Sequence, residues 1–466
     1  MSQRDHSRLL SNLAQAYTQH APKSAKMNLE AQKVLVDGGS HALRLIQPFP
    51  PRITAAQGAW VRDEDGHDIL DFWQGHHTNI LGHNPETLTA ALEDGFKERF
   101  GLQTGFTDHL QVEVAEILCQ QTQAERVRFT TSGSLATMYA TLLARAFTGR
   151  ELVMKVGGGW HGAQPWGLKG VGFHANKQNS FQHVDSAGLT PAMTDEVLVS
   201  RYNDPDMLED HFKNYGDQIA CFIVEPFIGA GGYLPAKHEY LQVARELTYR
   251  YGVVLIFDEI ISAFRFRAGD AGTLYGLRPD LATFGKIIGG GMPLSAVAGR
   301  AEIMNLVGRD GSSRVKFSGG TFSGHPATLL AAKTLLETLV AKEREIYPRL
   351  GALGQKARQI VEATFAEEGI CARCTGYPND ALAHSSISML HFPYREDCRI
   401  EGPEEIHNPE ICDQVLREKV MRLALLLEDV HVVHGLGSVT TAHTEADIEL
   451  LGEACHQVAR TIKEYL

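Results

Sequence analysis

The chain has 466 residues, a formal net charge of −12 and 43% hydrophobic residues. A chain of this length is too long to fold around one small core, so we expect a large domain and a smaller one. Positive charges form no basic run, so nucleic acid is not an expected partner. No stretch approaches the roughly 20 apolar residues of a membrane-spanning helix. The opening residues lack the apolar segment of a secretory signal, so we expect a cytoplasmic protein with no membrane partner.

The predicted elements change character along the chain. Residues 5–40 favour an amphipathic helix and then a turn at Gly38–Gly39, which is typical of a terminal arm. Residues 58–72 alternate around an Asp-Gly turn, which predicts a β-hairpin. Short β-branched runs alternate with helical stretches from about 105 to 330, which indicates parallel strands joined by crossover helices. Longer helical periods at 326–343 and 409–429 frame a few strands, such as one at 385–392, toward the C-terminus.

The expected fold class is therefore α/β, with a large doubly wound domain and a mostly parallel sheet. A smaller α+β domain completes the chain. The expected boundaries are an N-terminal arm with part of the small domain at 1–58, the large domain at 59–330 and the C-terminal small domain at 331–466.

The seven cysteines are an odd and scattered set. Cys371 and Cys374 form an isolated CxxC pair, with no second pair at the spacing of a zinc site. We expect free thiols and no metal.

Two segments carry the strongest chemical signals. An apolar strand ends in Asp258–Glu259, at the carboxyl end where ligands of open α/β sheets bind. Helix capping by Asp258 is the plain alternative. Lys286 stands between apolar residues and a run of three glycines. Apolar surroundings disfavour the charged form of a lysine and make the neutral amine, which can attack an aldehyde, accessible.

Two weaker motifs precede them in the chain. Ser132-Gly133-Ser134 stands between a strand and a helix, where hydroxyl and N–H groups suit a phosphate, although plain capping is the commoner role. Trp160 and His161 follow three glycines, and the indole face offers a surface for a ring or packs in the core.

In this order, the motifs resemble those of the fold-type I pyridoxal-phosphate enzymes. The likeness is to the class III aminotransferases, with their glutamate-1-semialdehyde aminomutase and β-amino-acid aminotransferase branches. It runs from about residue 35 to the C-terminus and is specific at FTTSGS, GWHG, EPFIGAGG, IFDEIISAFR, FGKIIGGGMP and SGGTFSGHPAT. The resemblance implies pyridoxal 5′-phosphate as cofactor and a homodimer whose subunits share each site.

The resemblance also assigns roles to single residues. Lys286 corresponds to the Schiff-base lysine that later moves protons at the substrate carbon, and Asp258 to the partner of the pyridine nitrogen. Gly320 and Thr321 correspond to a pair that reaches the phosphate of the neighbouring subunit. The remaining expected cofactor contacts are Ser132, Gly133 and Ser134 at the phosphate, Trp160 and Ile260 at the two ring faces, His161, and Glu225 close to the aspartate.

The substrate end departs from the family pattern. Gly435 stands where the aminomutase branch has a glutamate that recognises the substrate amino group, which argues against glutamate-1-semialdehyde. Arg44 is the expected partner of a carboxylate or phosphonate, since a guanidinium fork donates two parallel hydrogen bonds, but it is also readable as a surface residue of the arm. His76 and its neighbour His77 are expected near the pocket, or in a plain polar turn.

We therefore expect an aminotransferase that moves an amino group between a small amino acid or amine and a keto acid. An ammonia-lyase, aminomutase or racemase acting on a small amino compound is the alternative, because these enzymes share the same lysine, aspartate and phosphate turn. A catalytically silent binding protein on the same fold is a third reading, which the presence of both Lys286 and Asp258 disfavours.

Overall fold

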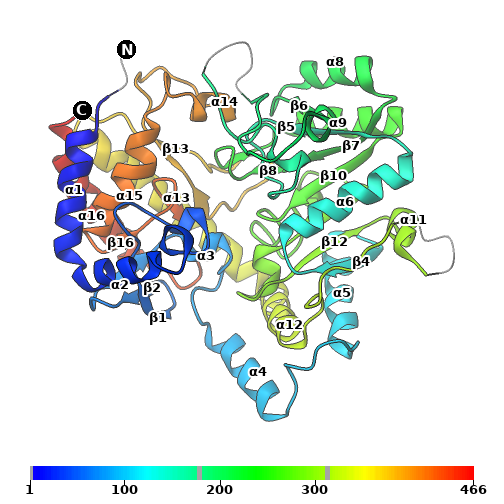
Figure 1. Cartoon of the computed structure of the whole chain (residues 1–466), viewed down its shortest axis with the longest axis horizontal. Coiled ribbons are helices and arrows are strands. Elements are labelled where there is room, and N and C mark those ends of the chain that lie inside the picture. The colour runs from blue at the N-terminus through cyan, green and yellow to red at the C-terminus, as the bar shows by residue number, and fades with distance from the viewer. Residues whose placement is uncertain (1–3, 176–180, 310–314) are drawn as a thin grey trace.

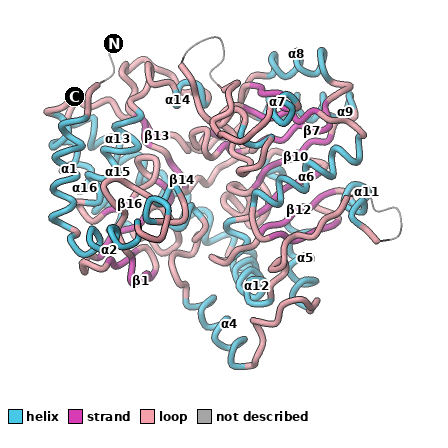
Figure 2. The backbone as a smooth tube through the Cα atoms, viewed as in Figure 1, coloured by secondary structure: helices cyan, strands magenta, loops and turns pink. Residues whose placement is uncertain are grey.

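The computed structural model describes residues 4–175, 181–309 and 315–466. In Figure 1 a large sheet with its helices lies on the right, and a second unit containing both termini lies on the left. Figure 2 shows that the longest strands belong to the large unit, whereas the second unit is mostly helical. No helix among the described residues combines the length and apolarity needed to cross a membrane.

The central sheet has seven strands in the order β4-β12-β11-β10-β7-β5-β6. All run parallel except β12, which is antiparallel to both of its neighbours. This arrangement confirms the expected α/β fold with a mostly parallel sheet. The strands are β4 (Arg126–Thr130), β5 (Leu152–Val156), β6 (Val197–Ser200), β7 (Ile219–Val224), β10 (Val254–Glu259), β11 (Leu281–Phe284) and β12 (Ser295–Gly299).

Continuous apolar sequence explains the centre of this sheet. Every residue of β7 and of β10 is buried, as expected for parallel strands covered by helices on both faces. Helix α6 packs against β7, β10, β11 and β12, and α9 packs against β10. The helices of this unit are α4 (Glu86–Lys97), α5 (His109–Thr122), α6 (Gly133–Thr148), α7 (Pro191–Asp195), α8 (Pro205–Tyr215), α9 (His238–Tyr251), α10 (Ala271–Leu274), α11 (Ala301–Met304) and α12 (Pro326–Ala341).

The second unit joins the two ends of the chain. The expected hairpin is present as β2 (Trp60–Asp63) and β3 (Asp68–Asp71), and β3 pairs in parallel with β16 (Val430–His431). Strand β1 (Ile53–Gln57) completes this sheet. The helices of this second unit are α1 (Ser7–His20), α2 (Pro22–Gln32), α13 (Glu343–Glu367), α14 (Pro403–His407), α15 (Met421–Leu426) and α16 (Glu445–Lys463).

One apolar core runs from α1 through the hairpin to α16. The boundary expected at residue 59 falls between β1 and β2 of one sheet, and the boundary expected at 331 falls within α12. The pairing of β3 with β16 favours a division in which the whole hairpin belongs with the C-terminal segment.

Some expected elements differ in extent. The single N-terminal helix is divided at Ala21, because Pro22 starts α2 at a position that needs no N–H donor. The helix expected at 409–429 begins later, as a π-helical turn at Leu416–Val420 that continues into α15. The strand expected at 385–392 is present as two short strands, β14 (Ile387–Ser388) and β15 (Leu390–His391), which pair with different partners.

Candidate active site

The carboxyl ends of β4, β5, β7, β10 and β11 meet at one edge of the central sheet, the edge at which open α/β sheets bind ligands. Each of these ends carries one of the motifs singled out in the sequence. The residues placed there are Ser132 after β4, His161 after β5, Glu225 after β7, Asp258 in β10 and Lys286 after β11.

Asp258 is buried and held by three donors. One carboxylate oxygen accepts from His161 Nδ1 at 2.7 Å, and the other accepts from Thr283 Oγ1 at 3.0 Å and from the Ile260 N–H at 3.2 Å. Burial lowers the pKa of His161, so the neutral ring donates its Nδ1 proton to the carboxylate. Asp258 therefore has a fixed orientation, and its first role is not that of a helix cap.

Lys286 begins the 3-10 helix η4 (Lys286–Gly289) with a left-handed φ of 47°. Burial lowers the pKa of its amine to about 8, against the opposing charges of Asp258 and Glu225, and the Arg265 guanidinium lowers it further. A non-glycine residue in this conformation costs free energy that the surrounding structure has to supply. The neutral amine expected from the sequence is thus accessible near physiological pH.

Glu225 stands behind the site and holds its loops. Its carboxylate oxygens accept from the Trp160 N–H at 3.1 Å and from the Gly229 N–H at 2.9 Å. Burial, together with the charge of Asp258, raises the pKa of Glu225 to about 8. The contacts point to a residue that positions the loop carrying Trp160.

The turn expected at the phosphate is tightly packed. Ser132 caps α6 by accepting from the Leu135 N–H at 3.3 Å. A Cβ atom at Gly133 would lie 3.1 Å from Ile260 Cδ1, and one at Gly162 would lie 2.5 Å from Ser134 Oγ. Only glycine allows this approach of the β5 loop to the start of α6. The first N–H groups of a 16-residue helix face this edge, where a phosphate is favoured.

The two expected ring contacts differ in exposure. Trp160 is 42% exposed, so its indole is not used to fill the core. Cβ atoms built at Gly133 and Gly285 would lie 3.1 and 2.9 Å from Ile260 Cδ1. The Ile260 side chain therefore lies between the phosphate turn and Lys286. Their stacking on a cofactor ring stays a prediction.

The pair expected to serve a neighbouring subunit lies on a surface loop. Gly320 has a φ of 95° and approaches Thr131 of its own chain, one residue before the phosphate turn. Thr321 is exposed. Both residues therefore lie at the rim of the sheet edge that carries the site.

Arg44 and His76 are brought together, although they are 32 residues apart. Arg44 ends the 3-10 helix η2 (Ala42–Arg44), and its Nε lies 3.5 Å from His76 Nε2. Burial lowers the pKa of His76 to about 3, and the charges of Arg44 and Lys286 add to this effect. His76 is consequently neutral and lies within electrostatic reach of the catalytic lysine.

Two residues close to Lys286, Arg265 and His77, escaped the sequence reasoning or were left without a definite role. Arg265 is buried and donates to the carbonyl oxygens of Ile261 and His77. His77 is also buried, and its ring bonds Tyr233 Oη on one side and Ser438 Oγ on the other. The motif that contains Arg265 was visible in the sequence, but nothing local indicated that the side chain turns inward.

Gly435 has a left-handed φ of 80°, and a Cβ atom there would lie 2.8 Å from the Cβ of Leu390. A glutamate at this position has no room for its first side-chain atom. Position 435 therefore accommodates glycine and not the glutamate of the aminomutase branch.

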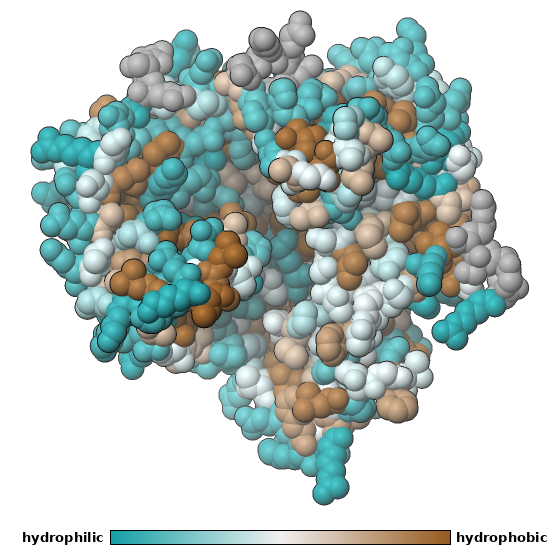
Figure 3. All heavy atoms as spheres, in the orientation of Figure 1, coloured by the Kyte–Doolittle hydropathy of each residue, from teal (hydrophilic) through white to brown (hydrophobic). Residues whose placement is uncertain are grey.

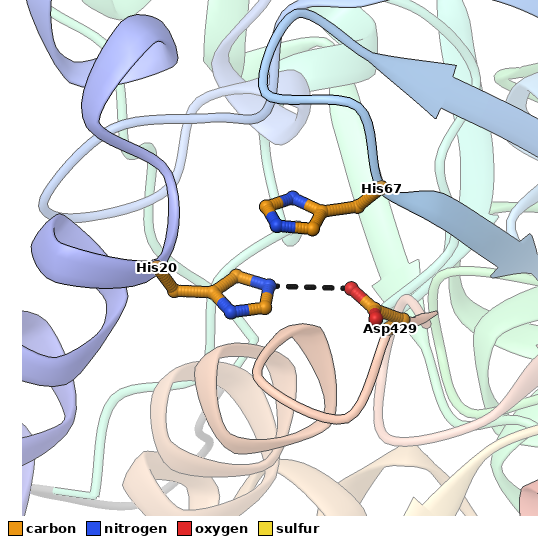
Figure 4. Close-up of side chains that lie close together, drawn as sticks. All are labelled: His20, His67 and Asp429. Atoms are coloured by element: carbon orange, nitrogen blue, oxygen red, sulfur yellow. Dashed lines mark hydrogen bonds and ion pairs between the residues drawn. The ribbon is translucent and has the colours of Figure 1, made fainter.

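A separate group of His20, His67 and Asp429 lies in the second unit (Figure 4). His20 Nε2 bonds Asp429 Oδ1 at 3.2 Å, and the two imidazole rings stack with centroids 4.0 Å apart and planes 9° apart. Stacked rings direct their lone pairs side by side and not toward a shared point. The group fastens the end of α1 to the hairpin turn and to the loop before β16.

Comparisons with known proteins identify the family of the chain. The sequence matches the Aminotransferase class-III family over residues 45–366. It is 30% identical over 436 residues to the glutamate-1-semialdehyde 2,1-aminomutase of Caldicellulosiruptor saccharolyticus, covering 92% of this chain and 95% of that protein.

Two solved structures share the fold over nearly the whole chain. The omega-transaminase from Sphaerobacter thermophilus has a TM-score of 0.83 and 30% identity, with 94% of this chain and 98% of that chain covered. The β-phenylalanine aminotransferase from Variovorax paradoxus has a TM-score of 0.83 and 26% identity, with 97% of each chain covered. The chain therefore belongs to the class III aminotransferase family and has the fold-type I transferase fold.

Proposed function

We propose that the protein is a pyridoxal-phosphate-dependent aminotransferase that moves an amino group between a small amino acid or amine and a keto acid. One observation carries the proposal. Lys286, with a pKa lowered to about 8, lies at the same sheet edge as a buried Asp258 that His161 and Thr283 hold in place.

The residues present fit the cofactor at both of its ends. The start of α6, with Ser132 and Ser134, suits the phosphate, and the fixed carboxylate of Asp258 suits a protonated ring nitrogen. Gly133, Gly162 and Gly285 allow the loops to pack closely around this edge, because a Cβ atom at each would lie within 3.1 Å of a neighbouring side chain. When bound, pyridoxal phosphate supplies an aldehyde for amines and a ring that withdraws electrons from the substrate carbon.

Lys286 has two tasks in this account. Its neutral amine would hold the cofactor through the aldehyde, which a protonated amine cannot do. With substrate in place, Nζ would accept a proton from the substrate carbon and later give it back. A pKa of about 8 suits both directions of this transfer, because efficient proton carriers have pKa values close to the working pH.

Asp258 keeps the ring nitrogen protonated, and its three donors prevent the carboxylate from turning away. His161 is a positioning residue in this respect. Glu225 maintains the loop that presents Trp160, and Trp160 and Ile260 hold the two faces of the ring.

We further propose a homodimer in which Gly320 and Thr321 reach the partner's phosphate site. The surface next to this pair is apolar: Phe322 is 59% exposed and Phe106 is 76% exposed. Gln111 Nε2 donates to the Phe106 carbonyl oxygen, and the Gln111 side chain would lie 3.2 Å from a Cβ atom at Gly324. The loop that carries Phe106 therefore lies beside the loop that carries Phe322. Figure 3 shows that hydrophobic side chains also emerge in groups on the face turned to the viewer. Exposed aromatic groups of this kind mark interaction surfaces.

An aminomutase is the second candidate, because the curated relatives carry that name. An aminomutase returns the amino group to the same carbon skeleton and needs no keto acid. Gly435, at the position of the glutamate that recognises the substrate amino group in that branch, disfavours glutamate-1-semialdehyde as its substrate.

The test is a two-substrate assay with a panel of amino donors and keto acids, with ammonia measured in parallel. An aminotransferase gives a new amino acid from the acceptor, ping-pong kinetics and no ammonia. Lys286→Ala is expected to abolish turnover while the protein stays folded. Products that accumulate over many turnovers without any acceptor would replace the proposal with a mutase or a lyase.

A further inference from the structure

Arg422 lies on α15 and is partly buried. Its side chain faces the N-terminal arm and the start of α3 (Gln74–His77). Its guanidinium lies over the Trp73 ring, 5.2 Å from the centroid, and donates to the Leu43 carbonyl oxygen at 2.7 Å. The Nε atom is buried and has no hydrogen-bond partner within the described part of the chain. Arg422 is therefore rigidly held and keeps donor capacity unused.

Two rings in contact, those of Trp73 and His76, connect Arg422 to Arg44. The Trp73 ring packs against His76 with centroids 4.4 Å apart, and Arg44 Nε lies 3.5 Å from the same imidazole. The charges of Arg44, Lys286 and Arg422 all lower the pKa of His76. Three cations thus surround one neutral histidine at the substrate side of the site.

No described carboxylate neutralises the two arginines. Over residues 4–175, 181–309 and 315–466, no Asp or Glu oxygen lies within 4.0 Å of a guanidinium nitrogen of Arg44 or Arg422. Glu418 lies on the preceding helical turn and raises the pKa of Arg422, but its own carboxylate is bonded by Arg417 and His434. Burial lowers the pKa of Arg422 to about 10, so the side chain still carries its charge at neutral pH.

Arg44 is exposed and Arg422 is partly buried, so an anion that contacts both would meet two positive charges that no described carboxylate neutralises. A single carboxylate is matched by the fork of Arg44 alone. A second, fixed guanidinium adds a charge that a monoanion leaves unbalanced, and such an imbalance is costly in a partly buried site.

We propose that Arg44 and Arg422 together bind a dianionic head group on the amino substrate, a phosphonate or a second carboxylate. The amino substrate itself rests on the proposed function. Arg44 contacts the head group from the N-terminal arm, and Arg422 contacts it from α15. The neutral His76 ring between them donates or accepts one hydrogen bond without adding charge.

The test compares head groups on the holoenzyme. The probes are 3-aminopropanoate, 2-aminoethylphosphonate and aspartate at alkaline pH, where the phosphonate carries two charges. Dissociation constants come from changes in the visible band of the bound cofactor and need no turnover. Wild-type protein is expected to bind at least one dianion about 10-fold or more tightly than 3-aminopropanoate, since hydrogen bonds to charged groups have free energies of that order.

Arg422→Gln is expected to remove this preference and to change the affinity for 3-aminopropanoate little. Arg422→Lys is expected to restore part of it, and Arg62→Gln, an exposed arginine paired with Asp68, serves as the matched control. Methylphosphonate, which has no amine, is expected to compete in wild-type protein and not in Arg422→Gln.

Equal affinity of wild-type protein for all probes would overturn the inference. Equal weakening of all probes by Arg422→Gln would overturn it too, because Arg422 would then only anchor the arm through Leu43. A phosphonate preference without an aspartate preference identifies the head group, and the reverse identifies a dicarboxylate. Absence of amino-group transfer in the two-substrate assay refutes the proposed function and leaves the head-group comparison intact.

Discussion

Attachment of the cofactor to the apoprotein is expected to depend on pH through Lys286. An ordinary lysine has a pKa of about 10.4, so only about 0.04% of it is neutral at pH 7. With the pKa of Lys286 lowered to about 8, its neutral fraction is about 10% at pH 7 and about 1% at pH 6. Burial thus enriches the reactive amine by a factor of about 250 at neutral pH.

The assay mixes apoprotein with pyridoxal phosphate and follows the visible band. The second-order rate is expected to rise about tenfold from pH 6 to pH 7 and to level off above pH 8, as the neutral fraction does. An N-α-acetyl-lysine amide control measures the ionisation of pyridoxal phosphate itself. Asp258→Asn removes a charge that stabilises the ammonium form and is expected to move the midpoint to lower pH. A midpoint close to that of the free lysine would refute the reasoning.

A second buried lysine gives an internal control. Burial also lowers the pKa of Lys155, to about 7, but its Nζ donates to the carbonyl oxygens of Gly159, Gly167 and Lys169. This enclosure leaves no open face for attack. Reductive trapping is therefore expected to label Lys286 and to leave Lys155 unmodified.

Three further outcomes follow from single contacts. Arg44→Ala is expected to raise the Michaelis constant about 10-fold or more by removing a charged hydrogen bond, and an unchanged constant in steady-state assays would move the anion site elsewhere. His161→Phe leaves one oxygen of Asp258 without its donor, so kcat/KM is expected to fall about 10- to 100-fold, while a wild-type value would show that Thr283 suffices. Asp71→Asn is expected to lower the free energy of unfolding by about 3 kcal/mol in denaturant titrations. Burial raises the pKa of Asp71, but hydrogen bonds from His431 and His83 outweigh it and hold this pKa well below its ordinary value. The stabilisation is thus present above about pH 4 and lost as pH falls further, and the variant is expected to lack this acid sensitivity.

The sheet and its chemistry were open to prediction because their signals are local. The strands that end in Val224 and Glu259 are continuous apolar runs, and such runs indicate buried parallel strands. Lys286 stood out as a lysine among apolar residues and glycines, and its position at the strand edge follows from the fold. The motifs singled out in the sequence therefore lie together at one sheet edge, and their contacts with a cofactor stay a prediction.

The substrate side depends on contacts between distant segments. Arg422 meets Leu43 across the chain, and nothing near Arg422 in the sequence distinguishes it from Arg417, which pairs with Glu418 on the same helix. The helix predicted at 409–429 likewise contains a π-helical turn at Leu416–Val420, which the apolar period does not indicate.

A single turnover tests the central claim most directly. Holoenzyme is mixed with an amino donor and no acceptor, and the visible band, the carbonyl product and ammonia are measured in one experiment. The account predicts that the band disappears with one equivalent of carbonyl product per site and no ammonia. Continuous release of ammonia with a persistent band would contradict it and identify a lyase.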